Sequence, residues 1–242
     1  MRIKNLSEFK SHVIECYPQE ACGVLVNGVF SPLTNVHPSP ADNFMLSEQD
    51  SFSLASKPEK FSIVHSHTMD SFTNDPRTPS YDDMRSQLNL GVQWGIVHCD
   101  GISVTEILEF GEPNECDLLG RKYISNVYDC FTIARDFYWQ NYAIDFGTHP
   151  RPDDWEKWNP HYIENHYKDL GFIDLKYGEP QKYGDILLFK IASNNINHIG
   201  VANDLGKFIH HLHNRKSCVD SQEKWHRQLY KVIRRSCGKN TT

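Results

Sequence analysis

The sequence predicts an α+β protein of two domains, and three observations support this fold class. The 242-residue chain has 39% hydrophobic and 12% aromatic residues, which is enough for packed cores in one large or two small domains. Both halves mix helical apolar spacing with short apolar runs that end in turn residues. Between them, the polar segment 111–115 breaks both periodicities and carries a proline. We therefore expect a first domain over residues 1–113 and a second over residues 117–242.

Charge, cysteine usage and hydropathy exclude several classes of protein. Lys and Arg number 25 against 31 Asp and Glu, and no strongly basic block occurs, so we do not expect a nucleic-acid binder. The seven cysteines include no Cys-x-x-Cys pair and indicate mostly reduced thiols. The start lacks an apolar signal core and no long apolar span follows, which predicts no membrane insertion and folding in a cytoplasm.

In the first half, apolar residues recur at helical spacing before Pro18, and turn signals separate the apolar runs after it. Asn27-Gly28 is a strong hairpin signal, and Gly91 suits a helix end. Residues 31–60 are rich in Pro, Ser, Asn and Asp, and we expect a strand and a loop there. The other expected elements are a helix over 6–17, a hairpin over 21–30, a strand over 61–67, a helix over 79–90 and a strand pair over 93–99 and 102–110.

Two histidines, His65 and His67, follow a short apolar run at positions i and i+2. That spacing places both imidazoles on one side of a strand end. Asp83 lies downstream on the predicted helix, and two His with one carboxylate form a catalytic zinc set because they leave a fourth position open for water. A carboxylate elsewhere must then act as the base, and Glu20 is the candidate. The alternative is a pair of surface histidines in a polar loop.

The order Glu20, His65-x-His67 and Ser80-x-x-Asp83 resembles the JAMM metallopeptidases. The resemblance implies a mixed-sheet α/β domain that binds one Zn²⁺ through His65, His67 and Asp83. It also implies that Glu20 takes the proton of the zinc-bound water and passes it to the leaving amine, while Ser80 donates a hydrogen bond to the developing oxyanion.

The second half begins with a helical pattern and continues as a series of strands. Apolar residues fall at helical spacing after Cys130, and Asp129 suits the N-cap of that helix. An aromatic, acidic insert follows, which is expected either to shape a substrate cleft or to dock a partner. The expected later elements are a short helix over 162–170 and strands over 183–189, 197–202, 206–210 and 228–234.

Cys130 is expected to open the first helix of this half, where the positive end of the helix dipole lowers the pKa of a thiol. A small buried residue is the alternative. The series Cys130, His198 and His210 resembles the NlpC-type papain-like cysteine peptidases, although Phe131 and Thr132 replace the small residues usual after the nucleophile. The resemblance implies a papain-like α+β domain in which His198 activates Cys130, and His210 orients His198. Cys130 is then expected to be the most alkylation-prone of the cysteines.

The order of the two motifs, metallopeptidase-like and then cysteine-peptidase-like, resembles a family of tail-tip assembly proteins of lambda-like, long-tailed bacteriophages. The resemblance implies that the second domain hydrolyses an amide of the peptidoglycan peptide stem, near the D-glutamyl–diaminopimelate bond, and that the first is a zinc-dependent peptidase or isopeptidase. It implies other phage tail-tip proteins as partners and assembly in the host cytoplasm, with the virion tail tip as an open alternative. Two other functions stay open: a structural assembly factor whose peptidase-like sites are dispensable, and a cytoplasmic processing peptidase.

Overall fold

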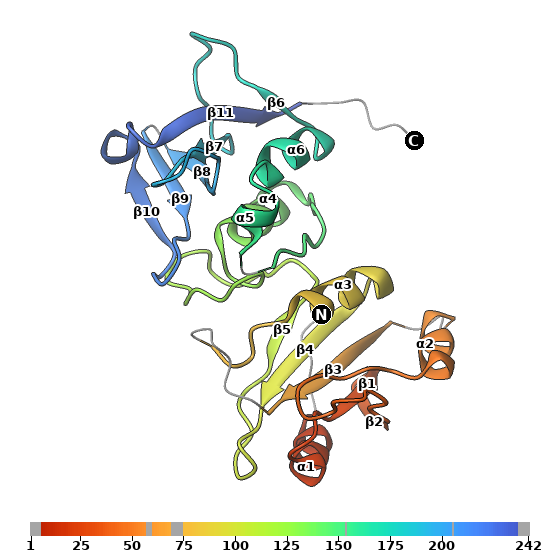
Figure 1. Cartoon of the computed structure of the whole chain (residues 1–242). Coiled ribbons are helices and arrows are strands. Elements are labelled where there is room, and N and C mark those ends of the chain that lie inside the picture. Colours follow the sequence, from red (N-terminus) through yellow and green to blue (C-terminus); the bar gives the residue numbers. More distant parts are fainter. Residues whose placement is uncertain (1–5, 57–59, 69–74, 153, 205, 237–242) are drawn as a thin grey trace. The chain divides into compact units, whose positions relative to one another are not determined.

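The computed structural model describes residues 6–56, 60–68, 75–152, 154–204 and 206–236. The chain divides into two compact units, which are labelled by element in Figure 1. Unit 1 comprises Met1–Glu112 with Thr148–Pro150, and unit 2 comprises Pro113–Gly147 with Arg151–Thr242. The division falls within the polar segment 111–115. The sequence did not indicate that Thr148–Pro150 groups with unit 1.

Unit 1 is a mixed sheet with helices. Its elements in chain order are α1 (Ser7–Cys16), β1 (Cys22–Val26), β2 (Val29–Leu33), α2 (Glu48–Ala55), β3 (Phe61–His67), α3 (Tyr81–Leu90), β4 (Gln93–His98) and β5 (Leu108–Phe110). Among the described residues, the strands form a sheet in the order β2-β1-β3-β4-β5. Only the β3–β4 pairing of this described sheet is parallel, with α3 as the crossover between the two strands.

Local signals explain most of unit 1. The β1–β2 hairpin turns at Asn27 and Gly28, which have φ of 52° and 81°. Positive φ at both central residues is what a two-residue type I′ turn requires. The buried face of α1 presents Phe9 and Val13 to Val64 of the sheet, in one apolar cluster. The mixture of helices and strands predicted from the sequence is confirmed.

Two expectations for unit 1 were wrong. Helix α2 replaces part of the loop expected over 31–60; it begins after Ser47, whose side chain accepts a hydrogen bond from the backbone N–H of Asp50. Its apolar pattern is weak because Phe52 is 77% exposed and Leu54 is the buried apolar residue of the helix. Strand β5 is also shorter than expected, since Ile102 is 89% exposed and lies outside it.

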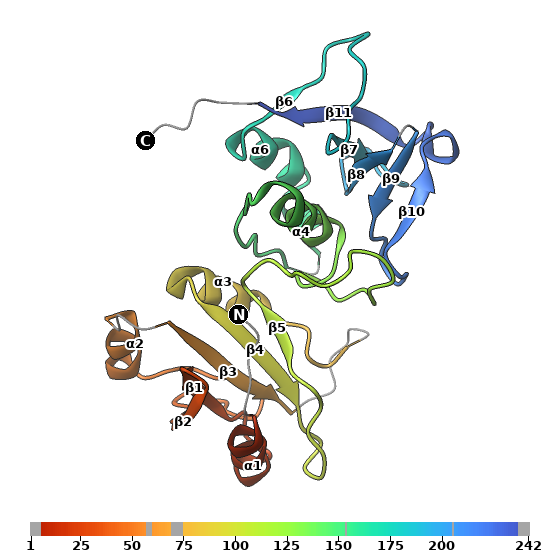
Figure 2. The ribbon, with the colours of Figure 1, turned by 180° about the vertical axis from the view of Figure 1, so that it is seen from behind.

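Unit 2 pairs a larger sheet with helices, as Figure 2 shows from behind. Its elements are α4 (Cys130–Tyr142), α5 (Trp155–Trp158), α6 (Tyr162–Asp169), β6 (Phe172–Asp174), β7 (Ile186–Phe189), β8 (His198–Asp204), β9 (Lys207–His210), β10 (Cys218–Ser221), the 3₁₀ turn η1 (Glu223–Trp225) and β11 (Leu229–Arg235). The described strands run in the order β10-β9-β8-β7-β11-β6, with antiparallel pairings throughout. Helices α4 and α6 agree with the expected ones, whereas β6, β10 and α5 were not predicted.

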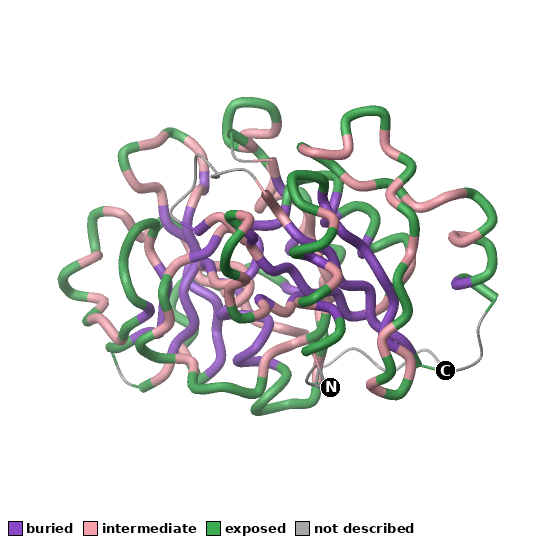
Figure 3. Tube along the Cα trace, turned by 90° about the horizontal axis from the view of Figure 1, so that it is seen from below, coloured by how far each residue is buried: buried purple, intermediate pink, exposed green. Residues whose placement is uncertain are grey.

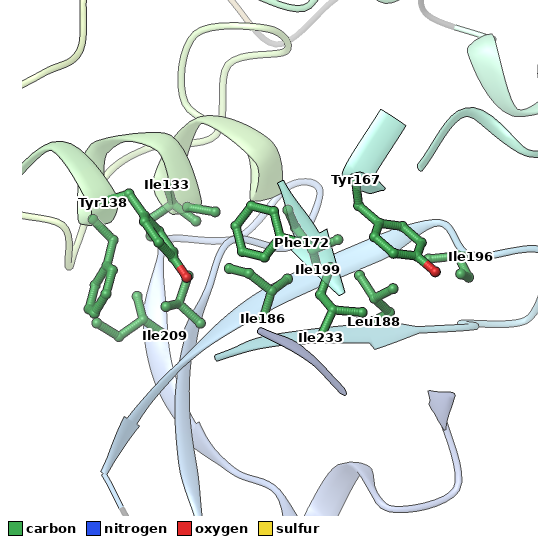
Figure 4. Packing of buried hydrophobic residues seen from close by; sticks show 13 residues of the cluster. Ile133, Tyr138, Tyr167, Phe172, Ile186, Leu188, Ile196, Ile199, Ile209 and Ile233 are labelled. Carbon is green, nitrogen blue, oxygen red and sulfur yellow. The ribbon is translucent and has the colours of Figure 1, made fainter. Parts of the chain in front are cut away.

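The two faces of the unit 2 sheet carry different apolar clusters. One cluster joins α4 and α6 to the sheet, and Figure 4 shows Ile133 and Tyr138 of α4 near Ile209 and Phe172. The other cluster lies on the opposite side of the same strands and includes Phe208, with Trp225 packed against it. Because both faces are covered, β7 is buried at every position and β8 at its first five. Figure 3 shows the buried stretches of the whole chain in purple. No helix in the described part of the chain combines the length and apolarity that a membrane crossing requires.

Candidate functional site

Unit 1 brings the predicted zinc ligands together at the end of β3. His65 and His67 project to the same face of this strand, and the crossover to α3 places Asp83 opposite them. The two histidine Nε2 atoms are 3.3 Å apart. Asp83 Oδ1 lies 3.3 Å from His65 Nε2, and Asp83 Oδ2 lies 3.6 Å from His67 Nε2. The three residues therefore converge on one point, as the sequence predicted.

Asp83 is held in place by the N-terminus of α3. The Ser80 hydroxyl accepts a hydrogen bond from the Asp83 backbone N–H at 3.1 Å, and the Ser80 N–H donates to Asp83 Oδ2 at 2.7 Å. This reciprocal capping box fixes the carboxylate from both sides. Ser80 thus positions Asp83, and its role at the oxyanion stays a prediction.

The surroundings of the two histidines orient their rings. His67 Nδ1 lies 2.8 Å from the carbonyl oxygen of Pro76, so Nδ1–H donates there and the lone pair of Nε2 faces the cluster. His65 is fully buried and stacks on Phe44, with ring centroids 4.3 Å apart, while Trp94 meets it edge-on. The side chain of His67 is 13% exposed, so the cluster is open to solvent on that side.

This donor set fits a zinc ion. Ligand atoms bound at ~2.0–2.2 Å to a tetrahedral zinc lie about 3.3–3.6 Å from one another, and the three distances between these side chains fall in that range. Two imidazole nitrogens and one carboxylate leave a fourth coordination position for water or substrate. In the described part of the chain, this is one of two groups of His, Cys or carboxylate side chains whose ligand atoms all lie within 4.8 Å.

The pKa values of the two carboxyl groups in and near the cluster, Asp83 and Glu20, shift in opposite directions. Although burial opposes it, the hydrogen bonds and charges of His65 and His67 hold the pKa of Asp83 well below its usual range. Burial lowers the pKa of His65, whereas for His67 the hydrogen bond and charge of Asp83 outweigh burial and raise the pKa. Burial raises the pKa of Glu20 to about 8, while the charge of nearby His67 lowers it and that of Asp83 raises it. Glu20 therefore lies within electrostatic range of the cluster, and this pKa suits a group that exchanges a proton near neutral pH.

Glu20 reaches this place through its backbone. Its N–H donates to the carbonyl of Pro40, and its carbonyl accepts from the Asn35 side chain. The next residue, Ala21, donates to the Ser66 hydroxyl at 2.9 Å. These bonds fix the entry to β1 beside the strand that carries the histidines.

In unit 2, Cys130 opens helix α4 as predicted, and Asp129 caps it. Asp129 Oδ1 accepts hydrogen bonds from the backbone N–H groups of Phe131 and Thr132, both at 2.9 Å. Asp129 Oδ2 accepts from the N–H of Asn126 and from the guanidinium of the buried Arg151. The start of the helix is therefore anchored by a buried ion pair.

The two predicted histidines meet in the sheet. His198 Nε2 lies 3.0 Å from His210 Nδ1, because β8 and β9 pair with Gly200 opposite His210 and His198 diagonal to it. Gly200 is required between them, since a Cβ there would come within 2.4 Å of the Phe208 ring. Phe208 in turn packs against His210.

Asp220 extends this pair and was missed by the sequence reasoning. Asp220 Oδ2 lies 3.3 Å from His210 Nε2 and accepts a hydrogen bond from Trp225 Nε1 at 2.9 Å. The Cys218 sulfur is also near, 3.5 Å from His210 Nε2. The β9–β10 pairing places Cys218 opposite His210. This contact could have been found from the sequence only by predicting a strand over 218–221.

The structure does not join Cys130 to His198 directly. Among the described residues, the sulfur interacts with the backbone of Ile199, the residue after His198, and no hydrogen bond links it to the imidazole. Helix α4 packs on the face of the sheet that carries Ile199 and Ile209. His198 lies opposite Phe189 on the neighbouring strand β7, and both residues belong to the other face of the sheet. The predicted series is thus brought to one strand end without thiol–imidazole contact.

The predicted lowering of the Cys130 pKa was wrong. Burial of the thiol and the charge of Asp129 outweigh the Arg151 charge and raise the pKa of Cys130 to about 12. Burial, with the charge of His210, lowers the pKa of His198 to about 3. Near neutral pH the resting pair is therefore an uncharged thiol and an uncharged imidazole.

An apolar cavity of about 50 Å³ adjoins Cys130 within unit 2. Arg151, Trp155 and Tyr162, which belong to the insert between α4 and β7, form part of its wall. The insert therefore lines the space next to the candidate nucleophile, and its role in a substrate cleft or in docking a partner stays a prediction.

Comparisons with known proteins found relatives among the tail tip assembly proteins of phages. No family model matches the chain. The chain is 27% identical to the tail tip assembly protein K of Escherichia phage N15 over 244 residues, which cover 97% of this chain and 95% of the relative. It is 26% identical to the tail tip assembly protein K of Escherichia phage lambda over 192 residues, which cover 78% of this chain and 88% of the relative.

Solved structures give a weaker likeness. The NlpC/p60 domain of the peptidoglycan hydrolase SagA has 18% identity and a TM-score of 0.31, covering 48% of this chain and 87% of that domain. An NLP/P60 family lipoprotein-like protein of Staphylococcus aureus has 15% identity and a TM-score of 0.33, covering 50% of this chain and 38% of that one. Both TM-scores are too low to define a fold, so the relationship rests on the sequence matches. The chain is homologous to the tail tip assembly proteins K of lambda-like phages, over 97% of its length for phage N15 and 78% for phage lambda.

Proposed function

We propose that the protein acts in phage tail-tip assembly and that unit 2 is a cysteine peptidase of the peptidoglycan peptide stem. The relatives of phages N15 and lambda, which match 97% and 78% of the chain, support the assembly role and imply other tail-tip proteins as partners. The observation that carries the peptidase role is the chain His198–His210–Asp220, at the strand end beside the helix that Cys130 opens. The substrate class, an amide near the D-glutamyl–diaminopimelate bond, is supported by the resemblance of this series to NlpC-type peptidases.

The hydrogen-bond chain sets which imidazole nitrogen can act as base. When His210 Nε2–H donates to Asp220, the Nδ1 atom of His210 has a lone pair and accepts from His198 Nε2–H. His198 Nδ1 is then unprotonated and can take the proton of Cys130 once thiol and imidazole meet. Asp220 thereby positions the proton without touching the substrate.

Amide cleavage would then follow in two stages. The Cys130 sulfur attacks the carbonyl carbon as its proton passes to His198, and the backbone N–H of Cys130, in the first turn of α4, would stabilise the oxyanion. His198 returns the proton to the leaving amine, and the C–N bond breaks to give a thioester. A water molecule, deprotonated by His198, hydrolyses the thioester and regenerates the thiol.

For unit 1 we propose a zinc-dependent peptidase or isopeptidase. His65, His67 and Asp83 would hold the ion, whose bound form supplies Lewis acidity and lowers the pKa of water to near 7. Glu20, with its raised pKa, can hold a proton near neutral pH and deliver it to a leaving amine. Ser80 keeps Asp83 in register through the capping box.

Defined muropeptides separate the two activities. Cleavage of a stem peptide that survives a chelator and disappears in Cys130→Ala is the result expected for unit 2. Cleavage that a chelator abolishes, and that is lost in His65→Ala/His67→Ala but kept in Cys130→Ala, is expected for unit 1. If purified wild-type protein cleaves no muropeptide in either condition, the peptidase proposal is wrong.

A second function, tail assembly without peptidolysis, is favoured by one observation. The Cys130 pKa is raised to about 12 and its sulfur does not hydrogen-bond His198 among the described residues. Complementation of a phage that lacks this gene distinguishes the two functions. Plaques restored by Cys130→Ala as fully as by wild type support the assembly role alone, and plaques restored by wild type only support peptidolysis.

A further inference from the structure

We propose that His210, Cys218 and Asp220 form a metal site in unit 2 that takes a thiophilic divalent cation such as Zn²⁺ and that occupation of this site switches off the cysteine centre. The ligand atoms of the three side chains all lie within 4.8 Å of one another. The binding part of this proposal stands on geometry alone. The regulatory part rests on the proposed peptidase function.

The site is built on a paired sheet edge and is therefore rigid. Strands β9 and β10 pair with Cys218 directly opposite His210. Asp220 follows Cys218 at i+2, so both side chains project to the face of β10 that His210 occupies. The His210 ring is fully buried, while Cys218 is exposed, which leaves room for a water ligand on the outer side.

The distances match those of a tetrahedral ion with nitrogen, sulfur and oxygen ligands. His210 Nε2 lies 3.5 Å from Cys218 Sγ and 3.3 Å from Asp220 Oδ2. Ligand atoms at ~2.0–2.3 Å from a tetrahedral zinc lie about 3.3–3.7 Å apart. A thiolate with an imidazole selects Zn²⁺ or a similar soft cation over Mg²⁺ or Ca²⁺.

Two further groups hold the carboxylate. Trp225 Nε1–H donates to Asp220 Oδ2 at 2.9 Å and thereby orients it, as outer partners of metal ligands do. The Lys224 ammonium lies 3.2 Å from both oxygens of Asp220 and would compete with a cation. Its side chain is 61% exposed, so it can swing into water when the ion binds.

Metal binding would act on Cys130 through the ring protons. An ion at His210 Nε2 leaves the ring proton on Nδ1, which then donates to His198 Nε2. His198 must in turn carry its proton on Nδ1, the nitrogen needed to accept the thiol proton. The cation therefore inverts the tautomer that Asp220 alone selects, and the base is lost.

Cobalt titration of the full chain tests the site independently of activity. The protein carries His65→Ala and His67→Ala, so that the unit 1 site is absent, and is kept reduced. We expect one Co²⁺ per chain with a thiolate-to-cobalt charge-transfer band. Adding Cys218→Ser should remove the band and weaken binding about tenfold or more, because a ligand is lost. The matched control Cys116→Ser, another exposed cysteine of unit 2, should keep the band.

Lys224→Gln should tighten binding because it removes the competing ammonium. No charge-transfer band in the His65→Ala/His67→Ala protein, or a band that survives Cys218→Ser, overturns the site.

For regulation, Zn²⁺ should inhibit stem-peptide cleavage in the His65→Ala/His67→Ala background, and Cys218→Ser should relieve the inhibition. Cleavage unaffected by Zn²⁺ despite the band overturns the switch. A band without any cleavage in metal-free protein counts against the proposed peptidase function and leaves the metal site standing.

Discussion

Asp129 fixes the start of the helix that presents Cys130, and its replacement by alanine should destabilise unit 2 strongly. The carboxylate accepts hydrogen bonds from the backbone N–H groups of Asn126, Phe131 and Thr132 and pairs with Arg151. Both charged side chains are buried, at 3% exposure for Asp129 and 8% for Arg151. Asp129→Ala would therefore remove the carboxylate that balances the charge of a buried guanidinium.

The expected loss follows from two overlapping effects. Losing an N-cap carboxylate costs about 1 kcal/mol of helix stability. Leaving one partner of a buried pair costs about 3–5 kcal/mol. Because both effects arise from one carboxylate they do not simply add, and we expect the free energy of unfolding of unit 2 to fall by about 3–5 kcal/mol. The double variant Asp129→Ala/Arg151→Met should recover part of this loss, because it also removes the buried guanidinium charge.

Urea unfolding followed by tryptophan fluorescence measures this loss, since four of the five tryptophans belong to unit 2. The matched control is Asp154→Ala, which breaks the exposed pair with Lys157 at 4.0 Å and should cost about 1 kcal/mol or less. A fall below about 1 kcal/mol for Asp129→Ala, or a double variant less stable than the single one, would refute the assignment of the buried pair.

Three further results are expected. In a Cys218→Ser background the protein should bind one Zn²⁺ per chain, and His65→Ala/His67→Ala should abolish it by metal analysis; full zinc content in that variant would rule out these ligands. Glu20→Gln should keep the metal but lose any chelator-sensitive cleavage, and normal turnover would exclude Glu20 as the proton carrier. Burial lowers the pKa of His198 from an unfolded value near 6.5 to about 3, so only the unfolded chain binds this proton between those values and stability rises with pH there. His198→Gln should flatten the rise by up to about 1.4 kcal/mol per pH unit between pH 4 and 6, and an unchanged slope in urea unfolding would contradict the burial of a neutral imidazole.

The sequence predicted those features of the fold that short-range signals encode. Asn27-Gly28 sets a hairpin because both residues adopt positive φ, and Gly91 ends α3 at φ of 64°. The i, i+2 spacing of His65 and His67 settles which face of β3 they share. Each of these features depends on residues that are neighbours in the chain. The turn and the helix end also need positive φ, which glycine and asparagine adopt more easily than other residues.

The remaining features depend on contacts between distant segments. Asp220 acts only because β10 pairs with β9, and the chain between His210 and Cys218 gives no periodic signal for that strand. The pKa of Cys130 depends on burial by residues far along the chain, which outweighs the helix dipole that sequence reasoning invoked. Helix α2 exposes Phe52, so its apolar pattern misled the assignment.

The reactivity of Cys130 gives the last prediction, and the structure reverses what the motif alone suggested. A thiol whose pKa is raised to about 12 carries far less thiolate at pH 7 than an ordinary cysteine with a pKa near 8.5. After allowing for its higher intrinsic nucleophilicity, we expect iodoacetamide to label Cys130 about a hundredfold more slowly than the exposed Cys116 of the same unit. His198→Ala should leave the Cys130 rate unchanged below pH 8, because the uncharged imidazole does not hold a thiolate in the resting protein. Peptide mass spectrometry over a pH series resolves each cysteine. Rapid labelling of Cys130 at pH 6 that His198→Ala abolishes would show a thiolate–imidazolium pair and would overturn the neutral resting state. Slow labelling means that the Cys130 thiol gives its proton to His198 only as the sulfur attacks, as a serine hydroxyl does in a hydroxyl–imidazole pair.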